Sequence, residues 1–177
     1  MTALANRVFE ELRARNLRLV LAESCTGGLG AALLARIPGV SEFLCGSAVV
    51  YQVETKAEWL RVPRRLLLTS GPVSHEVASA MAIGALKITP KADVSAAVTG
   101  HLGPGAPPEQ DGVVFLAFAR RNRSARLGRV AVKRIELSAE ARDGGTGRLG
   151  KRLRRQRSAA AHLLDWILLN LPKSHRK

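Results

Sequence analysis

Short apolar runs that alternate with segments of helical periodicity are the feature that most constrains the fold of this chain. Three of these runs have the length and composition of buried strands: residues 17–22, 44–53 and 94–99. Three segments with apolar residues at helical spacing lie beside them: residues 3–16, 24–36 and 74–87. Strands and helices in alternation predict a layered α/β domain.

The second half of the chain departs from this alternation. Residues 113–121 and 129–137 both have the pattern of strands, and no helical segment separates them. Such neighbours predict an antiparallel pair, so the sheet should be mixed rather than purely parallel. A long final helix is expected over residues 151–171. Because the chain has 177 residues, of which 46% are hydrophobic, we expect residues 1–177 to form a single domain.

Positive charge is concentrated in one segment. The net charge is +14, and residues 120–157 contribute +11 of it, from 14 basic and 3 acidic residues. Such a segment can meet a nucleic acid, an anionic surface or a phosphorylated small molecule, or it can be a solvated arginine-rich face. The segment contains no aromatic residue that could stack on bases, so we do not expect nucleic acid as the partner.

Several classes of protein are disfavoured by what the sequence lacks. Cys25 and Cys45 form no CxxC pair and no metal-ligand motif is present, so we expect no disulfide scaffold, no metal site and no cofactor. Residues 1–15 form a charged amphipathic segment rather than a secretory leader, and the apolar stretch 159–171 is too short to cross a bilayer. A cytoplasmic protein that does not enter a membrane is therefore expected.

The first candidate site follows the first predicted strand, where residues 23–28 read Glu-Ser-Cys-Thr-Gly-Gly. Gly27 and Gly28 allow the backbone to come close to a ligand, and the N–H groups at a helix start favour an anion. Ser24 and Thr26 each offer a hydroxyl nucleophile or, as the alternative, a simple N-cap for the helix.

The second candidate site lies at the end of the next strand, where residues 51–56 read Tyr-Gln-Val-Glu-Thr-Lys. Side chains at the carboxyl ends of strands line the ligand crevice of an open α/β sheet, so Ser24 and Lys56 should face the same crevice. Partial burial lowers the proton affinity of a lysine, which lets it accept a proton from a serine. The alternative is that Lys56 is a solvated lysine at a helix start.

The third candidate site is the loop rich in glycine and proline that follows the third predicted strand. Thr99 can offer its hydroxyl to a ligand there, and Gly100 and its neighbours can offer backbone N–H groups. His101 is a candidate base, although a lone loop histidine is more often solvated. The alternative is a plain connector, and we expect Glu109 and Asp111 further along it to be solvated.

Four ordered stretches together resemble the C-terminal domain of the competence-damage-inducible protein CinA. They are AESCTGG at 22–28, GSAVVYQVETK at 46–56, GPVSHEVASAMAIGALK at 71–87 and AAVTGHLGPG at 96–105. The resemblance covers residues 3–120 with good order and spacing, and residues 121–171 more weakly. Stand-alone members of this family are nicotinamide-nucleotide amidohydrolases, also called NMN deamidases.

The resemblance implies a three-layer α/β/α sandwich with a mixed sheet of about five strands. It also implies hydrolysis of the carboxamide of nicotinamide mononucleotide to nicotinate mononucleotide and ammonia. By motif, Ser24 falls at the family's nucleophile and Lys56 at its basic partner. Four further residues fall at pocket positions: Thr26, Tyr51, Thr99 and Gly100. An activated serine needs an oxyanion stabiliser, for which the N–H groups of residues 26–28 or 100–102 are candidates, and it needs no metal.

Three places differ from the family's usual pattern. Val53 stands where the family usually has an amide side chain, and His101 and Leu102 are bulkier than the usual residues of the pocket loop. Residues 150–152 read Gly-Lys-Arg where the family has Gly-Asp-Arg, and we assign Arg152 to substrate binding. A catalytically altered member that binds a nucleotide or a protein partner is therefore a second hypothesis, and a basic protein associated with nucleic acid is a third.

The final predicted helix has a charge pattern that opposes its own dipole. Four arginines crowd its first two turns: Arg152, Arg154, Arg155 and Arg157. Cations at a helix N-terminus are unfavourable, so we expect a compensating anion, either a substrate phosphate near Arg148, Arg152 or Arg155 or an acidic patch on a neighbouring subunit. The second half of the helix is apolar on more than one face, which predicts a homo-oligomer, most simply a dimer. The alternative is a helix packed wholly inside its own domain.

Overall fold

A mixed sheet of five strands forms the centre of the protein. The computed structural model describes residues 1–122, 124–138 and 148–172. The strands are β1 (Leu19–Glu23), β2 (Leu44–Val49), β3 (Val94–Gly100), β4 (Val113–Arg121) and β5 (Leu127–Glu136). They are arranged in the order β2-β1-β3-β4-β5. The strand β1 pairs in parallel with β2 and β3, and β3–β4 and β4–β5 are antiparallel, so the predicted mixed sheet is confirmed.

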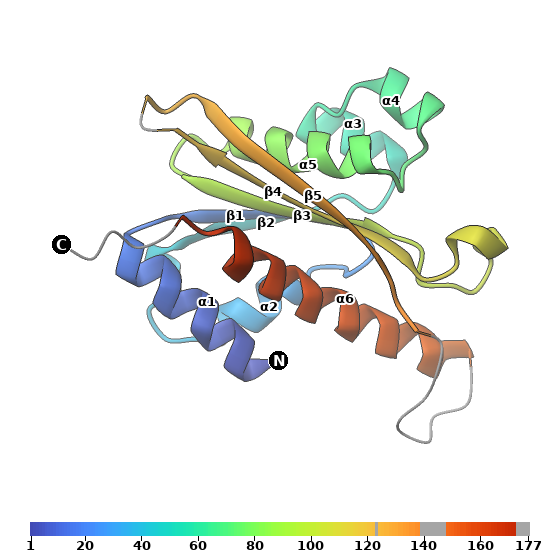
Figure 1. The fold of residues 1–177 in the computed structure, drawn as a ribbon, viewed down its shortest axis with the longest axis horizontal. Helices are drawn as coiled ribbons and strands as arrows, with labels where there is room; N and C mark the ends of the chain where they lie inside the picture. Colours follow the sequence, from blue (N-terminus) through green and yellow to red (C-terminus); the bar gives the residue numbers. More distant parts are fainter. Residues whose placement is uncertain (123, 139–147, 173–177) are drawn as a thin grey trace.

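Helices cover the two faces of this sheet (Figure 1). One face carries α1 (Thr2–Arg15), α2 (Leu29–Ala35) and α6 (Arg148–Asn170). The other carries α3 (Val53–Leu60), α4 (Arg64–Thr69) and α5 (His75–Ile88). Two short 3-10 turns, Val40–Glu42 and Pro108–Gln110, lie in connections. The α/β/α sandwich expected from the resemblance is therefore the observed fold.

Most elements follow the predicted pattern, but two boundaries differ. The strand expected over residues 44–53 ends at Val49, and α3 begins at Val53. The helix expected from residue 24 begins only at Leu29, and its N-cap is Gly28. Gly27 and Gly28 have φ angles of 63° and 93°, which a right-handed helix cannot contain. Ser24 is therefore not a helix cap, in contrast to one of the two predicted roles. The helix α4 was not predicted.

The helix α6 is covered mainly by its own domain. Leu163, Leu164 and Ile167 are fully buried in the core on the α1–α2 face of the sheet, and Leu171 is 8% exposed. The apolar residues that suggested a partner subunit are thus used within the chain, as in the alternative reading, and the homo-oligomer stays a prediction. No helix in the described ranges is long and apolar enough to span a bilayer.

Candidate active site

A buried carboxylate shapes the turn between β1 and α2. Glu23 is the last residue of β1 and is fully buried. Its two oxygens accept hydrogen bonds from the N–H groups of Gly30 (3.0 Å) and Ala31 (2.9 Å) and from the hydroxyls of Thr26 (2.7 Å) and Ser47 (3.1 Å). The start of α2 therefore already holds an anion that belongs to the chain, rather than offering these N–H groups to a ligand.

The turn places Ser24 at the carboxyl end of the sheet. The Ser24 N–H donates to the carbonyl of Val98 on β3 (3.0 Å), which extends the parallel pairing one residue beyond the strand. On the other side of β1, the Val50 N–H donates to the carbonyl of Glu23 (2.8 Å). Ser24 is thus fixed between the ends of β2 and β3, and its side chain is 7% exposed.

Ser24 meets Lys56 there, as the two strand-end motifs predicted. Lys56 lies in α3 and its side chain is only 1% exposed. Its Nζ donates to Oγ of Ser24 and to the carbonyl of Val50, each across 2.8 Å. The alternative of a solvated lysine is therefore wrong. Both acceptors are neutral, and no ion pair joins Lys56 to an acid in the part of the chain that the structure describes.

Burial without an ionic partner changes the proton affinity of Lys56. Loss of solvation disfavours the ammonium form and lowers the pKa of Lys56 from 10.5 to about 8. A lysine with this pKa can take up and return a proton near neutral pH. The neighbouring thiol of Cys25 behaves in the opposite way, because burial raises its pKa to about 12 and keeps it protonated. Of these two nucleophilic side chains, Ser24 is the one that a lysine of lowered pKa hydrogen-bonds.

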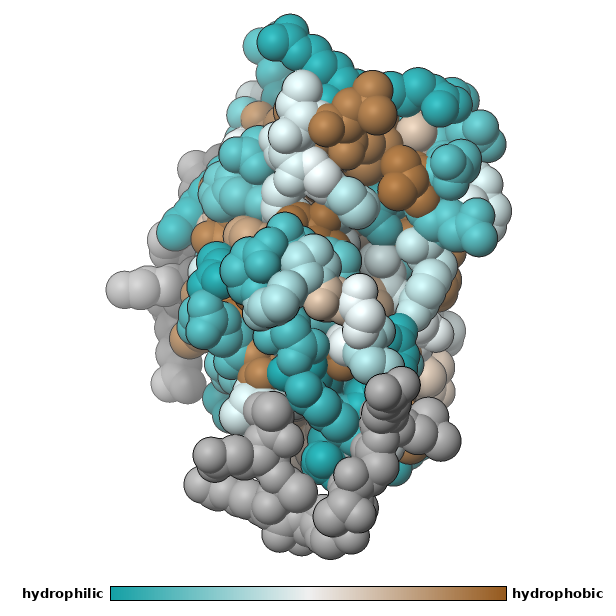
Figure 2. Space-filling model, turned by 90° about the vertical axis from the view of Figure 1, so that its right-hand side faces the viewer, coloured by the Kyte–Doolittle hydropathy of each residue, from teal (hydrophilic) through white to brown (hydrophobic). Residues whose placement is uncertain are grey.

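The Ser24–Lys56 pair lines a cavity of about 460 Å³ at the carboxyl edge of the sheet. Figure 2 views this side of the molecule and shows a largely hydrophilic face, with a compact hydrophobic area toward the top. Five of the predicted binding and catalytic residues line the cavity with Lys56: Ser24, Tyr51, Thr99, Gly100 and Arg152. Val53 and His101, two of the departures from the family pattern, line it as well.

Three predicted binding residues do not line this cavity: Thr26, Gly27 and Gly28. Thr26 is fully buried, and its hydroxyl is committed to Glu23. The two glycines form the turn itself, where their positive φ angles allow the chain to reverse toward α2. These residues shape the backbone around Ser24, and their assignment to substrate contact gains no support from their positions.

Two of the backbone donors expected to stabilise an oxyanion are already used. The Gly27 N–H donates to the carbonyl of Ser24 (3.0 Å), and the His101 N–H donates to the carbonyl of Val113 (2.9 Å). Leu102 is 2% exposed and packs into the core rather than into the cavity. Thr99 is fully buried, and its hydroxyl donates to the carbonyl of Pro72 (2.9 Å), which ties two segments of the cavity lining together.

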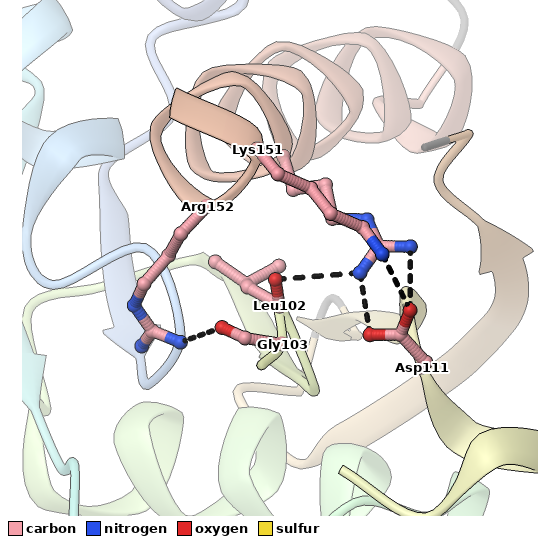
Figure 3. A network of polar contacts seen from close by, with 6 residues as sticks. Leu102, Gly103, Asp111, Lys151 and Arg152 are labelled. Carbon is pink, nitrogen blue, oxygen red and sulfur yellow. Dashed lines mark hydrogen bonds and ion pairs between the residues drawn. The ribbon is translucent and has the colours of Figure 1, made fainter. Parts of the chain in front are cut away.

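The start of α6 closes one side of the cavity with Arg152. Its guanidinium donates to the carbonyl of Gly103 (2.7 Å) and to the hydroxyl of Tyr51. Figure 3 shows Arg152 reaching from α6 to Gly103. Within the described residues no ion pair includes Arg152, so its charge faces the cavity with neutral partners. Arg148, another predicted phosphate ligand, begins α6, but its side chain lies outside the described part of the chain.

Asp111 is not a solvated loop residue, which corrects the expectation from the sequence. Its carboxylate accepts from both terminal nitrogens of Arg155 (2.6 and 3.1 Å) and from Nζ of Lys151 (2.9 Å). These hydrogen bonds lower the pKa of Asp111 to about 2. Arg155 is 3% exposed and turned toward Asp111, and it does not line the cavity. Asp111 is therefore an anion that compensates two cations at the start of α6.

The sequence reading missed the roles of Glu23 and Asp111. An acidic residue seven positions before Gly30 was a weak sign that Glu23 could bond to the start of α2. No local sign linked Asp111 to Arg155, which lies 44 positions later. In the described segments, no three His, Cys, Asp or Glu side chains are grouped closely enough to hold a metal ion.

Comparisons with known proteins place the sequence and fold of this chain in one family. The model of the CinA C-terminal domain matches residues 1–142. A "CinA-like protein" of Geobacter metallireducens is 48% identical over 109 residues, which are 60% of this chain and 26% of that protein. A "CinA-like protein" of Myxococcus xanthus is 39% identical over 132 residues, which are 73% of this chain and 31% of that protein. The chain thus spans about a quarter to a third of the length of these curated relatives.

Solved structures agree over nearly the whole chain. A CinA superfamily protein from Escherichia coli has a TM-score of 0.80 at 27% identity and covers 96% of this chain and 88% of its own. The competence/damage inducible protein CihA from Agrobacterium tumefaciens has a TM-score of 0.74 at 34% identity, with 93% of each chain covered. The fold therefore extends beyond the residues that the family model matches.

Proposed function

The chain belongs to the CinA C-terminal domain family, and from its site we propose that it is an amidohydrolase that converts nicotinamide mononucleotide to nicotinate mononucleotide and ammonia. The observation that carries the proposal is the 2.8 Å contact between Nζ of Lys56 and Oγ of Ser24 in a cavity lining. A serine hydroxyl is a weak nucleophile on its own, and an adjacent buried base is what activates it.

The proposed reaction uses these two side chains in two steps. Neutral Lys56 takes the proton of the Ser24 hydroxyl while Oγ attacks the carboxamide carbon. The tetrahedral intermediate then expels ammonia, which receives that proton from Lys56 and leaves a nicotinoyl ester on Ser24. In the second step Lys56 takes a proton from water, the hydroxide attacks the ester, and Ser24 regains its proton as the acid is released. The sum is amide plus water giving acid plus ammonia, and no step requires a metal.

The cavity suits a phosphorylated pyridine nucleotide in size and charge. Its volume of about 460 Å³ lies in the range of about 300–1,000 Å³ that is usual for small-molecule sites. Arg152 supplies a cation for a phosphate, and Tyr51 supplies an aromatic ring that is 55% exposed. The proposal therefore places the carboxamide at Ser24 and the phosphate toward α6.

A second candidate function rests on the cavity residues that differ from the family pattern. Val53 and His101 line the cavity, whereas Leu102 is buried outside it. A member that binds a nucleotide without hydrolysing it would keep the same fold and the same Arg152. The two functions differ in whether ammonia is released.

The test is ammonia release from nicotinamide mononucleotide by the purified chain, with nicotinate mononucleotide measured as the coupled product. We expect release by the native chain, none by Ser24→Ala, and native rates from Ser41→Ala, a serine in the 3-10 turn Val40–Glu42 away from the cavity lining. Nucleotide binding without ammonia release would favour the second function. Equal turnover in Ser24→Ala would contradict the serine mechanism.

A further inference from the structure

Resting on the proposed function, we infer that Asp111 is a positioning residue for the phosphate group of a mononucleotide. Its ion pairs with Arg155 and Lys151 hold the start of α6, from which Arg152 presents its guanidinium to the cavity (Figure 3). Asp111 itself does not line the cavity and acts through Arg152.

Arg152 is the cavity's available cation for an anionic group. The other expected anion site, the start of α2, is occupied by the carboxylate of Glu23. Lys56 is directed to Ser24 and to a backbone carbonyl, and it serves the reacting end of the substrate. Among the described residues, the acceptors of Arg152 are a carbonyl and a phenol, so a phosphate would gain charge-assisted hydrogen bonds from a guanidinium that no described acid pairs with.

The geometry of the Asp111 contacts fixes α6 in angle as well as distance. Arg155 binds both carboxylate oxygens at once, and this planar fork restricts rotation about the contact. Lys151 lies one turn earlier on α6 and binds the same carboxylate, so two points along the helix are held. In Figure 3, Lys151 and Arg152 leave α6 in different directions, with Leu102 and Gly103 of the loop between them.

The loop that carries the acceptor of Arg152 is packed against the same network. A Cβ atom added to Gly103 would lie 2.6 Å from Oδ1 of Asp111, and one added to Gly112 would lie 2.8 Å from a terminal nitrogen of Arg155. Both glycines have positive φ angles, so the loop follows a path that other residues rarely adopt. Asp111 is therefore packed against the loop whose Gly103 carbonyl accepts from Arg152, so a displacement of Asp111 is expected to disturb that contact.

The experiment compares a phosphorylated and an unphosphorylated ligand of the same base. Calorimetric binding of nicotinamide mononucleotide and of nicotinamide riboside is measured in a Ser24→Ala background, and KM and kcat for both are measured in the native background. Asp111→Asn should weaken nucleotide binding and raise its KM about tenfold, the size of one misplaced charge-assisted hydrogen bond. Values for the riboside, and kcat for the nucleotide, should stay within about twofold of native. Glu10→Gln, which removes the acid of the exposed Glu10–Arg13 pair, is the matched control and should change nothing.

A purely structural role would lower stability without this dependence on phosphate. If Asp111→Asn fails to fold, the double variant Asp111→Asn, Arg155→Gln is measured instead. It removes both charges of the pair, and the same loss of nucleotide affinity is expected. Equal losses for nucleotide and riboside, or no loss for the nucleotide, would overturn the inference while ammonia release by the native chain still supports the proposed function. Nucleotide binding that depends on Asp111 without any ammonia release would keep the inference and refute the amidohydrolase. A native chain that does not bind the nucleotide overturns both.

Discussion

The burial of Lys56 leads to a prediction in which stability and activity respond to pH in a linked way. The perturbation is Lys56→Met, which keeps the length and apolar character of the side chain and removes the titrating amine. In the folded chain the pKa of Lys56 is about 8, whereas its ordinary value is 10.5. The unfolded chain therefore holds a proton on Lys56 between about pH 8 and 10.5 that the folded chain has lost.

The sign of the effect follows from this difference in bound protons. Where the unfolded state binds more protons, the free energy of unfolding rises with pH. Below pH 8 native Lys56 is charged in both states, and its burial costs about 3 kcal/mol, from a shift of about 2.5 units at 1.36 kcal/mol per unit. Above pH 10.5 that cost is absent. The Lys56→Met variant has no cost of burying a charge at any pH. It does leave the Val50 carbonyl without its hydrogen-bond donor, which costs about 1–3 kcal/mol at every pH.

The change of stability with pH is therefore the informative quantity, because the cost of the lost hydrogen bond is the same at every pH and cancels. The stability of Lys56→Met relative to the native chain should fall by about 3 kcal/mol between pH 7 and pH 10.5. Urea unfolding followed by tryptophan fluorescence at several pH values measures this difference. Lys87→Met, at an exposed lysine of α5, is the matched control for the loss of a lysine side chain from a helix.

The same variant should release no ammonia at any pH, and kcat/KM of the native chain should rise through about pH 8 as Lys56 becomes neutral. A stability difference between Lys56→Met and the native chain that is constant from pH 7 to pH 10.5 would refute the burial argument. Near-native turnover in the variant would show that Lys56 is not the base.

Three further outcomes follow from individual contacts. Ser24→Ala should abolish ammonia release and lower the free energy of unfolding in urea by only about 1 kcal/mol, because Ser24 is not a helix cap and loses one hydrogen bond, to Lys56. A large loss of stability would contradict this account of Ser24. Glu23→Gln should lower the free energy of unfolding by about 2–3 kcal/mol, because an amide nitrogen cannot accept the bonds that the buried carboxylate receives, and a neutral effect would rule out its anchoring role. Gly84→Ala should lower the free energy of unfolding by at least about 1–3 kcal/mol in thermal unfolding, because the added Cβ would lie 2.0 Å from the Leu60 carbonyl oxygen. Unchanged stability would mean that α3 moves freely away from α5.

Local pattern was enough to predict most of the sheet. The bounds of β4 were predicted at residues 113–121 and observed there, because its apolar residues are continuous and a glycine and an asparagine flank them. The start of α2 was misplaced by five residues, since sequence alone does not say whether Gly27 and Gly28 continue a helix or reverse the chain. The unpredicted α4 is only six residues long and has a weak apolar pattern.

Topology, rather than any single motif, allowed the Ser24–Lys56 pair to be predicted. The two residues are 32 positions apart, but each follows a strand, and parallel neighbours bring their carboxyl ends together. What the strand-end rule cannot give is the direction of each side chain. Thr26 follows the same strand as Ser24, and yet its hydroxyl turns inward to Glu23. The reason is that a buried carboxylate must receive its hydrogen bonds from within the protein, whereas water can satisfy a solvated pocket.

The start of α6 shows why a charge pattern alone could not be assigned correctly. Cations at a helix N-terminus required an anion, and the sequence offered no basis for choosing among a substrate, a second subunit and a distant acid of the same chain. The structure supplies Asp111, which satisfies Lys151 and Arg155 and leaves Arg152 beside the cavity with neutral partners. Asp111 forms ion pairs with Lys151 and Arg155, and no acid among the described residues pairs with the guanidinium of Arg152. Under the proposed function, the position of Asp111 therefore predicts that Arg152, rather than Arg155, meets the phosphate.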